Sequence, residues 1–350
     1  MKYYYNVSMN KKYIFILTFT LILLGLGISY NFYQKIFGKS VLQNEKIYIT
    51  STDNLEEVNA KISPVLKNPK TFLWLAIKKK FTKPKAGMYL LKKGMSLNDV
   101  INLLQSGNQT PIKISFNNQD TLEKLAGRIA KQIEADSISI LNTMKDSLFL
   151  KEQNFTKKSA LSMYIPNTYE FYWNTSPEKF RSKMLKEYHR FWNEIRLNNA
   201  KKQGLTKEDV IILASIVQKE TAQISERPIV AGLYLNRLRN DWPLQADPTL
   251  IFALKEKKGQ HFIVKRVLNI DKEINSPYNT YKHKGLPPTL ISMPDISSID
   301  AVLNAKKHHY FYMCASINRI GFHEFTNSLH QHNKNAQKYQ HWIRKKGINR

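Results

Sequence analysis

The feature that most constrains this chain is a run near its N-terminus that carries no charged residue. Residues 13–34 contain no Asp, Glu, Lys or Arg, and residues 14–28 are mostly aliphatic or aromatic. A helix needs about 20 apolar residues to cross the hydrocarbon core of a bilayer. We therefore predict a transmembrane helix here, with the rest of the chain folding on one side of the membrane.

The flanks of this run indicate its orientation and distinguish an anchor from a cleaved signal peptide. Positive charges precede it at Lys2, Lys11 and Lys12, which favours a cytoplasmic N-terminus. A signal peptide would need a small-x-small cleavage site after the run, where this chain has Tyr-Asn-Phe-Tyr. We predict a cytoplasmic N-terminus (1–12), a single-pass anchor (13–34) in the plasma membrane, and an extracytoplasmic remainder.

The chain has a large net positive charge, but this charge alone does not identify a binding partner. Lys and Arg number 54 against 27 Asp and Glu, a net charge of +27, as in proteins that bind nucleic acid, anionic membranes or acidic polymers. The lysines are spread along the whole chain, and no zinc-finger, RNP or basic-zipper pattern is present. Together with the predicted topology, this argues against a nucleic-acid partner.

The single cysteine, Cys314, excludes an intramolecular disulfide framework and a cysteine zinc cluster. Its neighbours in HHYFYMCAS indicate a strand, where a lone cysteine is expected to be a small apolar core residue. His330 and His332 lie one residue apart, with His323 before them, but no acidic cluster accompanies them. We expect structural roles for these histidines, and neither a metal nor a cofactor.

Residues 45–112 are predicted to form a small α+β domain. The pattern predicts a strand at KIYIT, helices over 54–62 and 71–81, and a strand over 87–91. Ser96 and Asp99 then form a capping box before another helix. This strand–helix–helix–strand order is similar to a LysM module, a unit that binds sugar polymers. A structural spacer between membrane and catalytic part is the alternative.

The next region leads into the centre of the chain. We predict a strand over 113–116, a helix over 121–133 and an irregular polar segment over 136–158. The aromatic residues of 164–173 indicate an ordered loop or short strand, either stacking on sugar rings or filling the core. Residues 176–199 are predicted to form one amphipathic, basic helix.

A helix over residues 206–220 is apolar on nearly every side, which is typical of a core helix. Thr206 and Asp209 form a capping box at its start. Near its other end, Glu220 shares a face with the apolar residues Val217, Leu213 and Val210. Burial and the negative end of the helix dipole should both raise the pKa of Glu220, as a general acid requires. The alternative is a helix-end acid paired with Lys219 or Arg227.

The segments after this helix are typical of a cleft. A second helix carries Asn236 and ends at residues 240–243. Asp247 followed by proline is expected to cap a third helix. Two Pro-rich loops with polar tips, residues 276–281 and 285–288, are typical of a cleft rim.

Several motifs in this region, in this order, resemble the endolytic murein transglycosylase family, also called YceG-like or MltG. The matching pieces are LASIVQKET (213–221), SER (225–227), NRL (236–238), LQADPT (244–249), SPYNTY (276–281), GLPPTLIS (285–292) and the closing YFYMCAS…GFHEFTNSLHQHN. The resemblance covers about residue 113 to the C-terminus. The anchor and the LysM-like unit precede it in the expected order.

The resemblance implies an α+β chain: a transmembrane helix, a LysM-like domain (45–112), and a mainly helical, lysozyme-like catalytic domain with short strands (113–350, core 203–335). It implies a membrane-anchored lyase that cuts the β-1,4 bond between N-acetylmuramic acid and N-acetylglucosamine in peptidoglycan and leaves 1,6-anhydro ends. The family is linked to ending glycan polymerisation beside penicillin-binding synthases. A non-catalytic cell-wall scaffold for such synthases is the alternative.

The family's catalytic glutamate falls on Glu220. Many members have a second glutamate where this chain has Gln218, and Ser162 and Asn167 stand where the family has Gly and Asp. A lytic transglycosylase needs one carboxyl group, which protonates the leaving oxygen and then accepts the proton of the sugar's 6-hydroxyl. A hydrolase would pair two acids, with Asp247 as the second. The candidate residues for holding the sugar are Asn236, Gln245, Asp247, Asn279 and Tyr281.

Overall fold

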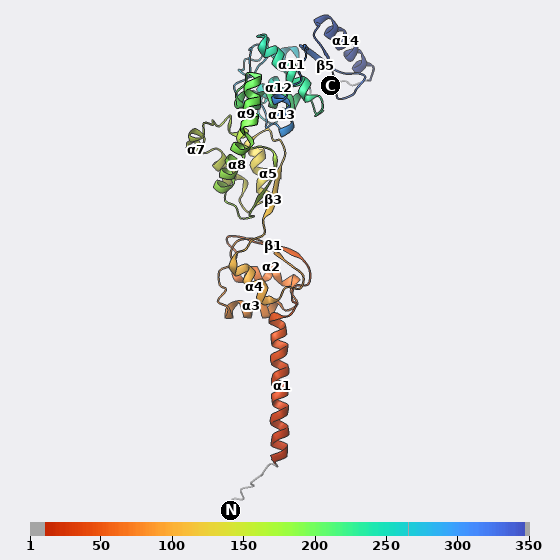
Figure 1. The fold of residues 1–350 in the computed structure, drawn as a ribbon. Helices are drawn as coiled ribbons and strands as arrows, with labels where there is room; N and C mark the ends of the chain where they lie inside the picture. The colour runs from red at the N-terminus through yellow and green to blue at the C-terminus, as the bar shows by residue number, and fades with distance from the viewer. Residues whose placement is uncertain (1–10, 265, 347–350) are drawn as a thin grey trace, which may run out of the picture. The chain divides into compact units, whose positions relative to one another are not determined.

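The chain folds into two compact units in a computed structural model that describes residues 11–264 and 266–346 (Figure 1). The first unit comprises the described residues up to Lys113 together with 170–175, and the second comprises 114–169 and the rest from Ser176 onward. Of the predicted cytoplasmic segment, only Lys11 and Lys12 lie within the described residues, and they begin the first helix.

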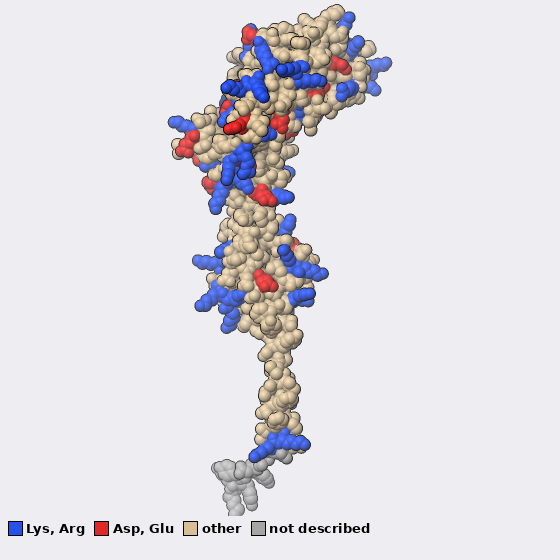
Figure 2. Space-filling model, in the orientation of Figure 1, with Lys and Arg blue, Asp and Glu red and all other residues tan. Residues whose placement is uncertain are grey.

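Helix α1 (Lys11–Phe37) contains the uncharged run, and every residue from 11 to 35 is exposed. Its 27 residues extend about 40 Å at 1.5 Å per residue. Among the described residues, α1 alone is long and apolar enough to span a membrane. Figure 2 shows lysines at its start and an uncharged surface along its length, while Lys and Arg are scattered over both units.

The first unit confirms the predicted order of strands and helices. β1 (Glu45–Ile49) pairs antiparallel with β2 (Gly87–Leu91), with Ile47 opposite Tyr89. Between them lie α2 (Leu55–Ile62) and α3 (Pro69–Lys78), and α4 (Leu97–Ser106) follows with the predicted Ser96–Asp99 capping box. The fully buried core residues are Ile49, Val58, Ile62, Phe72, Ala76, Tyr89, Leu91, Leu97, Val100, Ile101 and Leu104.

The second unit is mainly helical, and the described chain from Ile112 onward forms two short two-stranded sheets. The sheets are β3 (Ile112–Phe116) with β4 (Asn167–Phe171), and β5 (Tyr312–Ala315) with β6 (His323–Thr326). The helices are α5 (Leu122–Ala130), α6 (Ser137–Met144), α7 (Ser147–Glu152), α8 (Pro177–Phe191), α9 (Glu194–Gln203), α10 (Lys207–Glu220), α11 (Arg227–Arg239), α12 (Asp247–Lys258), α13 (Ile296–Leu303) and α14 (Leu329–Lys345).

Two sequence predictions in this unit were wrong in detail. The single helix over 176–199 is divided into α8 and α9, because Trp192 turns into the core and Asn193 caps a new helix by accepting a hydrogen bond from the N–H of Arg196. The polar segment 136–158 contains α6 and α7, each capped by an aspartate. Helices of one or two turns are too short to show a hydrophobic period.

Helix α10 lies at the centre of the second unit and contacts α11, α12 and α13. The predicted capping box is confirmed, since Thr206 Oγ1 accepts a hydrogen bond from the N–H of Asp209 and the Asp209 carboxylate accepts one from the N–H of Thr206. Val210, Leu213, Ala214, Ser215, Ile216 and Val217 are all fully buried. The helix therefore holds its last residue, Glu220, at the edge of a packed core.

Gly232 lets α11 approach a loop closely. A Cβ atom at this position would lie 2.3 Å from the carbonyl oxygen of Lys306 and 2.7 Å from the ring of His308. Gly127 of α5 is also a helical glycine, but it has nothing within 4 Å of such an atom. A glycine in the middle of a helix lowers stability relative to alanine. The close approach of the Lys306 backbone explains why glycine occupies position 232.

This difference predicts opposite effects for the same substitution. Gly232→Ala should lose about 1–3 kcal/mol of stability through overpacking. Gly127→Ala should gain about 0.4–1 kcal/mol, because alanine reduces the entropy of the unfolded chain without a clash. Thermal unfolding of the full-length protein in detergent measures both, and equal melting temperatures for the two variants would contradict the close approach.

Candidate active site

A pocket of about 540 Å³ opens in the second unit beside the end of α10. Its walls come from α10, α11, the segment that leads into α12, the loop after residue 271, the β5–β6 pair and α14. The lining residues are Glu220, Leu233, Tyr234, Arg237, Leu244, Gln245, Asp247, Lys272, Tyr281, Tyr312, Met313, Cys314, Ala315, His323, Leu329, His332 and Asn333.

Glu220 is partly buried and faces this pocket, and its neighbour is a tyrosine. The hydroxyl of Tyr234, on α11, donates a hydrogen bond of 2.6 Å to Glu220 Oε1. The two pairings considered as alternatives are absent from the described residues, because Lys219 pairs with Asp120 at 2.7 Å and Arg227 pairs with Asp295 at 2.9 Å. Glu220 is thus an unpaired acid rather than half of a surface salt bridge.

Burial raises the pKa of Glu220 to about 7, the direction predicted from the sequence. The Tyr234 hydrogen bond and the positive charge of Arg237 act against this rise, while the negative charge of Asp247 adds to it. A carboxyl group with a pKa near neutrality can give up a proton and take one back at the same pH. This is the protonation behaviour that acid–base catalysis requires.

Arg237 is a buried cation in the pocket wall, which the sequence did not single out from the many basic residues. Its guanidinium is held by backbone carbonyls: Nε donates to Phe311 O at 2.8 Å and Nη1 to Leu244 O at 2.6 Å. Because neutral carbonyls and no carboxylate satisfy these donors, its positive charge remains available to a negative charge at Glu220.

The prediction that Asp247 caps a helix was wrong. α12 begins at Asp247 itself, Ala246 occupies the cap position, and no side chain caps this end. The Asp247 carboxylate instead lines the pocket and accepts a 2.6 Å hydrogen bond from the hydroxyl of Tyr281. Burial is the main cause that raises the pKa of Tyr281, and the hydrogen bond to Asp247 adds to it. The Tyr281 hydroxyl therefore stays protonated and donates.

A strained turn directs Asp247 into the pocket. Gln245 lines the pocket with a φ of 51°, in the left-handed region that non-glycine residues occupy at a cost of about 1–3 kcal/mol. Its N–H donates to Thr280 O at 2.9 Å, and the N–H of Ala246 donates to Thr280 Oγ1 at 3.0 Å. The loop that contains Tyr281 is thereby joined to the start of α12, which explains why the strain persists.

Two predicted sugar-binding residues, Asn236 and Asn279, are absent from the pocket lining. Asn236 Nδ2 donates to the carbonyls of His308 and Tyr310, at 2.8 and 3.1 Å. Asn279 is fully buried, donates to two carbonyls, and accepts a 3.0 Å hydrogen bond from the N–H of Tyr281. Both amides hold backbone segments in place, and the loop over 285–288 contributes no lining residue.

A buried carboxylate–histidine pair, missed by sequence reasoning, lies where β6 contributes to the pocket wall. Glu226, 4% exposed, accepts hydrogen bonds from Thr221 Oγ1 (3.0 Å), the backbone N–H of His323 (2.7 Å) and His323 Nδ1 (2.8 Å). Since an ionised carboxylate can only accept, Nδ1 carries a proton and Nε2 is the ring nitrogen left for a ligand. The partners are 97 residues apart, so no local pattern indicates the pair.

Two further lining residues differ from their expected environments. Cys314 was predicted to be a core residue, but it is only partly buried, because strand β5 forms part of the pocket wall. His332 also lines the pocket, and its ring stacks on that of Tyr312 at 5.3 Å. His330 is exposed outside it.

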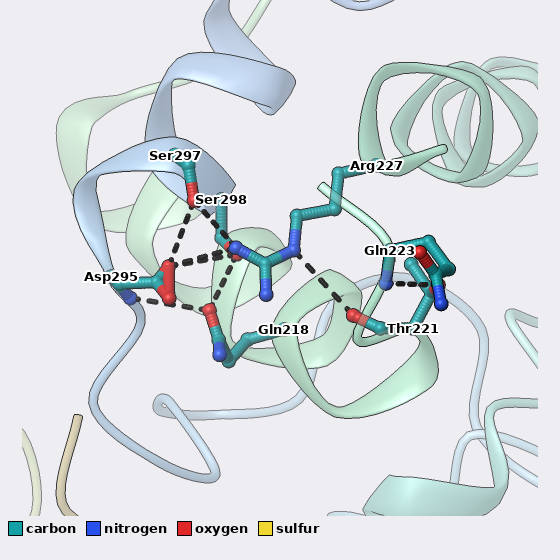
Figure 3. Close-up of polar contacts among 7 residues, drawn as sticks. All are labelled: Gln218, Thr221, Gln223, Arg227, Asp295, Ser297 and Ser298. Atoms are coloured by element: carbon teal, nitrogen blue, oxygen red, sulfur yellow. Dashed lines mark hydrogen bonds and ion pairs between the residues drawn. The ribbon is translucent and has the colours of Figure 1, made fainter. Parts of the chain in front are cut away.

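Gln218, two residues before Glu220, is directed to a separate polar network (Figure 3). Its Oε1 accepts hydrogen bonds from Ser298 Oγ at 2.6 Å and from the N–H of Asp295 at 3.3 Å. Arg227, 4% exposed, donates to Asp295 and to Ser297 in the same network. These contacts tie the end of α10 and the start of α11 to α13.

Fold and site together define a class of protein: a mainly helical domain whose pocket holds a carboxyl group, that of Glu220, with a pKa near neutrality. The profile of the YceG-like family matches residues 47–338. The chain belongs to the YceG-like family.

Similarity to individual proteins agrees with this assignment. The endolytic murein transglycosylase of Bacillus subtilis (strain 168) is 30% identical over 330 residues, covering 87% of this chain and 89% of that protein. The endolytic murein transglycosylase of Streptococcus pneumoniae (R6) is 26% identical, and the match covers 85% of this chain but 59% of the longer relative. The crystal structure of a yceG-like protein from Listeria monocytogenes has a TM-score of 0.55 and 27% identity, covering 83% of this chain and 98% of that one.

The raised pKa predicts how stability changes with pH when Glu220 is replaced. The folded state holds the Glu220 proton up to about pH 7, against 4.5 for an ordinary glutamate, so wild type loses stability as the pH rises from about 4.5 to 7 and no more beyond that. Glu220→Gln cannot ionise and should gain on the order of 1–3 kcal/mol relative to wild type between about pH 5 and pH 8.

Urea unfolding of both proteins across this pH range measures the difference. Glu208→Gln, which removes an exposed acid from the first turn of the same helix, is the matched control. A constant difference between Glu220→Gln and wild type across the range would show that the Glu220 carboxyl group is solvated.

Proposed function

We propose that this protein is a membrane-anchored lytic transglycosylase that cuts the β-1,4 bond between N-acetylmuramic acid and N-acetylglucosamine in peptidoglycan strands and leaves 1,6-anhydro-muramyl ends. The observation that carries this proposal is the single carboxyl group with a pKa near neutrality in the pocket. The names of the relatives, endolytic murein transglycosylases, supply the substrate class.

The reaction uses Glu220 as acid and then as base. The protonated carboxyl group gives its proton to the oxygen between the two sugars, and the bond from that oxygen to C1 of the muramyl residue breaks. The resulting carboxylate then accepts the proton of the muramyl 6-hydroxyl while that oxygen bonds to C1. One proton is donated and one is returned, so the cycle needs no water and no second carboxylate.

Tyr234 and Arg237 support Glu220 between these two steps. The carboxylate that forms after the first proton transfer retains the Tyr234 hydrogen bond and lies near the Arg237 charge, and both favour the ionised form. Without them, burial would hold the proton too tightly for its release. The balance of these effects keeps the pKa of Glu220 near 7.

The remaining polar groups of the pocket are proposed to hold the sugar. Gln245 and the Asp247–Tyr281 pair offer amide, carboxylate and hydroxyl groups from one wall. His323 offers Nε2 from another wall, with its ring fixed by Glu226, and is proposed to accept a hydrogen bond from a sugar hydroxyl. Asn236 and Asn279 are not proposed as sugar contacts, because their amides are occupied by the backbone.

The other parts of the chain are assigned by the same proposal. α1 anchors the protein in the plasma membrane with a cytoplasmic N-terminus, which explains its exposed apolar surface. The unit over 45–112 is proposed to be LysM-like and to contact glycan, and the domain over 113–350 to act on nascent strands outside the cytoplasm. Termination of glycan elongation beside penicillin-binding synthases is the proposed cellular role.

Product analysis tests the reaction and its catalytic residue together. Full-length protein in detergent should release glycan with 1,6-anhydro ends from purified sacculi, as measured by mass spectrometry. Glu220→Gln should lower the rate by at least about 100-fold, the lower range for a missing general acid–base group. Glu208→Gln should retain the wild-type rate.

Each alternative function predicts a different outcome, either in this assay or in the cell. Reducing ends in place of anhydro ends would indicate a hydrolase, in which Asp247→Asn should abolish activity as completely as Glu220→Gln. A protein whose cellular function survives Glu220→Gln would be the non-catalytic scaffold for peptidoglycan synthases.

The proposed role of His323 makes a separate prediction. His323→Ala should lower kcat/KM by about tenfold, since one lost hydrogen bond to substrate is worth about 1.4 kcal/mol. Added imidazole should restore part of the activity, because it can occupy the vacated space and supply the ring nitrogen.

His330→Ala, which removes an exposed histidine outside the pocket, should leave kcat/KM unchanged. A folded His323→Ala variant with full activity would exclude the substrate contact.

A further inference from the structure

Helix α3 of the first unit has an outward face that its own fold does not explain. Phe72, Leu75 and Ala76 pack into the core, as expected for an amphipathic helix. The opposite face nevertheless carries Trp74, 42% exposed, and Ile77, 60% exposed. Helical spacing places Lys70 and Lys78 on this same face. We refer to Lys70, Trp74, Ile77 and Lys78 as the α3 outer face.

A contact with α1 sets the position of this face relative to the proposed membrane span. The ring of Trp74 meets the ring of Phe32 edge to face, with centroids 5.0 Å apart. α3 and α4 both contact the end of α1, and Ile36 is part of the core of the unit. Figure 1 likewise shows α3 and α4 on the side of this unit where α1 enters. Trp74 is therefore rigidly attached to the last turns of α1.

The length of the uncharged run places Phe32 at the membrane surface. Residues 13–34 extend about 33 Å as a helix, close to the roughly 30 Å of a hydrocarbon core. If this run spans the bilayer, Phe32 lies at its outer edge, and the 5.0 Å contact places Trp74 at nearly the same depth. Tryptophan is enriched at this interface, since its ring is amphipathic.

The charges around the α3 outer face suit anionic lipid. Lys35 and Lys39 follow the uncharged run, and neither α1 nor α3 contains an acidic residue. Lys78 Nζ lies 6.0 Å from the centre of the Trp74 ring. Lysines beside an interfacial tryptophan can extend their amines to lipid phosphates while their stems cover apolar surface.

We propose that the α3 outer face is a second membrane contact, seated in the headgroup layer of anionic phospholipids on the extracytoplasmic leaflet. This inference rests on the proposed membrane anchor. With a single span alone, α1 and the first unit packed on its end could tilt and turn together in the membrane. Contact along α3 fixes the orientation of this unit on the membrane surface.

The depth of residue 77 tests this proposal in the full-length protein. Cys314 is the only cysteine, so Cys314→Ser with Ile77→Cys creates one site for an environment-sensitive fluorophore such as NBD. Glu56→Cys in the same background is the matched control, because Glu56 is exposed on α2. Each labelled protein is reconstituted into vesicles that contain phosphatidylglycerol, with or without brominated acyl chains.

We expect a blue-shifted emission from the label at position 77 and quenching by the brominated lipid, and neither effect at position 56. Lys70→Glu with Lys78→Glu should reduce the blue shift, as should vesicles of phosphatidylcholine alone. Water-like emission at both positions would overturn the proposal. Equal blue shifts in charged and neutral vesicles would overturn the role of anionic lipid.

Flotation of the vesicles after a carbonate wash separates this proposal from the proposed anchor. Protein that floats with the vesicles while its label at position 77 remains in water is anchored but lacks the second contact. Protein that does not float would instead overturn the transmembrane assignment of α1. Thermal unfolding of each labelled variant confirms that the substitutions leave the fold intact.

Discussion

The proposed chemistry depends on one hydrogen bond at the edge of a packed core, from the hydroxyl of Tyr234 to the carboxyl group of Glu220. α10 is buried on most sides, so its last residue reaches the pocket already largely removed from water. Burial alone would keep the proton on Glu220, while Tyr234 and Arg237 favour its release. The pKa near 7 results from this opposition, and the proposed chemistry requires it.

The residues around Glu220 adopt arrangements that are each unfavourable in free energy when taken alone. Gln245 has strained backbone geometry, Arg237 is buried among carbonyls, and Glu226 is buried beside His323. Each arrangement persists because surrounding bonds over-determine it. Gln218 and Arg227 tie the end of α10 and the start of α11 to α13 (Figure 3). These contacts hold the helix that carries Glu220 in place, although much of the pocket wall is loop.

The first unit meets a different constraint, because α3 serves the core on one side and, in our proposal, a membrane surface on the other. α3 buries Phe72 on one side and presents Trp74 on the other, against α1. A small α+β unit that merely separated anchor from enzyme would gain nothing from an exposed tryptophan there. The large positive charge of the chain is scattered over both units, and the lysines nearest α1 are the ones that our proposal assigns to lipid.

The sequence by itself determined the features encoded within a turn or two of chain: the uncharged helix, both capping boxes, and the face and pKa direction of Glu220. Tertiary structure alone decided the partners of the polar groups. Asp247 accepts from Tyr281 instead of capping α12, Asn279 serves the backbone, and Glu226 meets a histidine 97 residues away. Periodicity and capping depend on neighbours in sequence, whereas a buried polar group bonds to whatever the packing of distant elements brings within 3 Å.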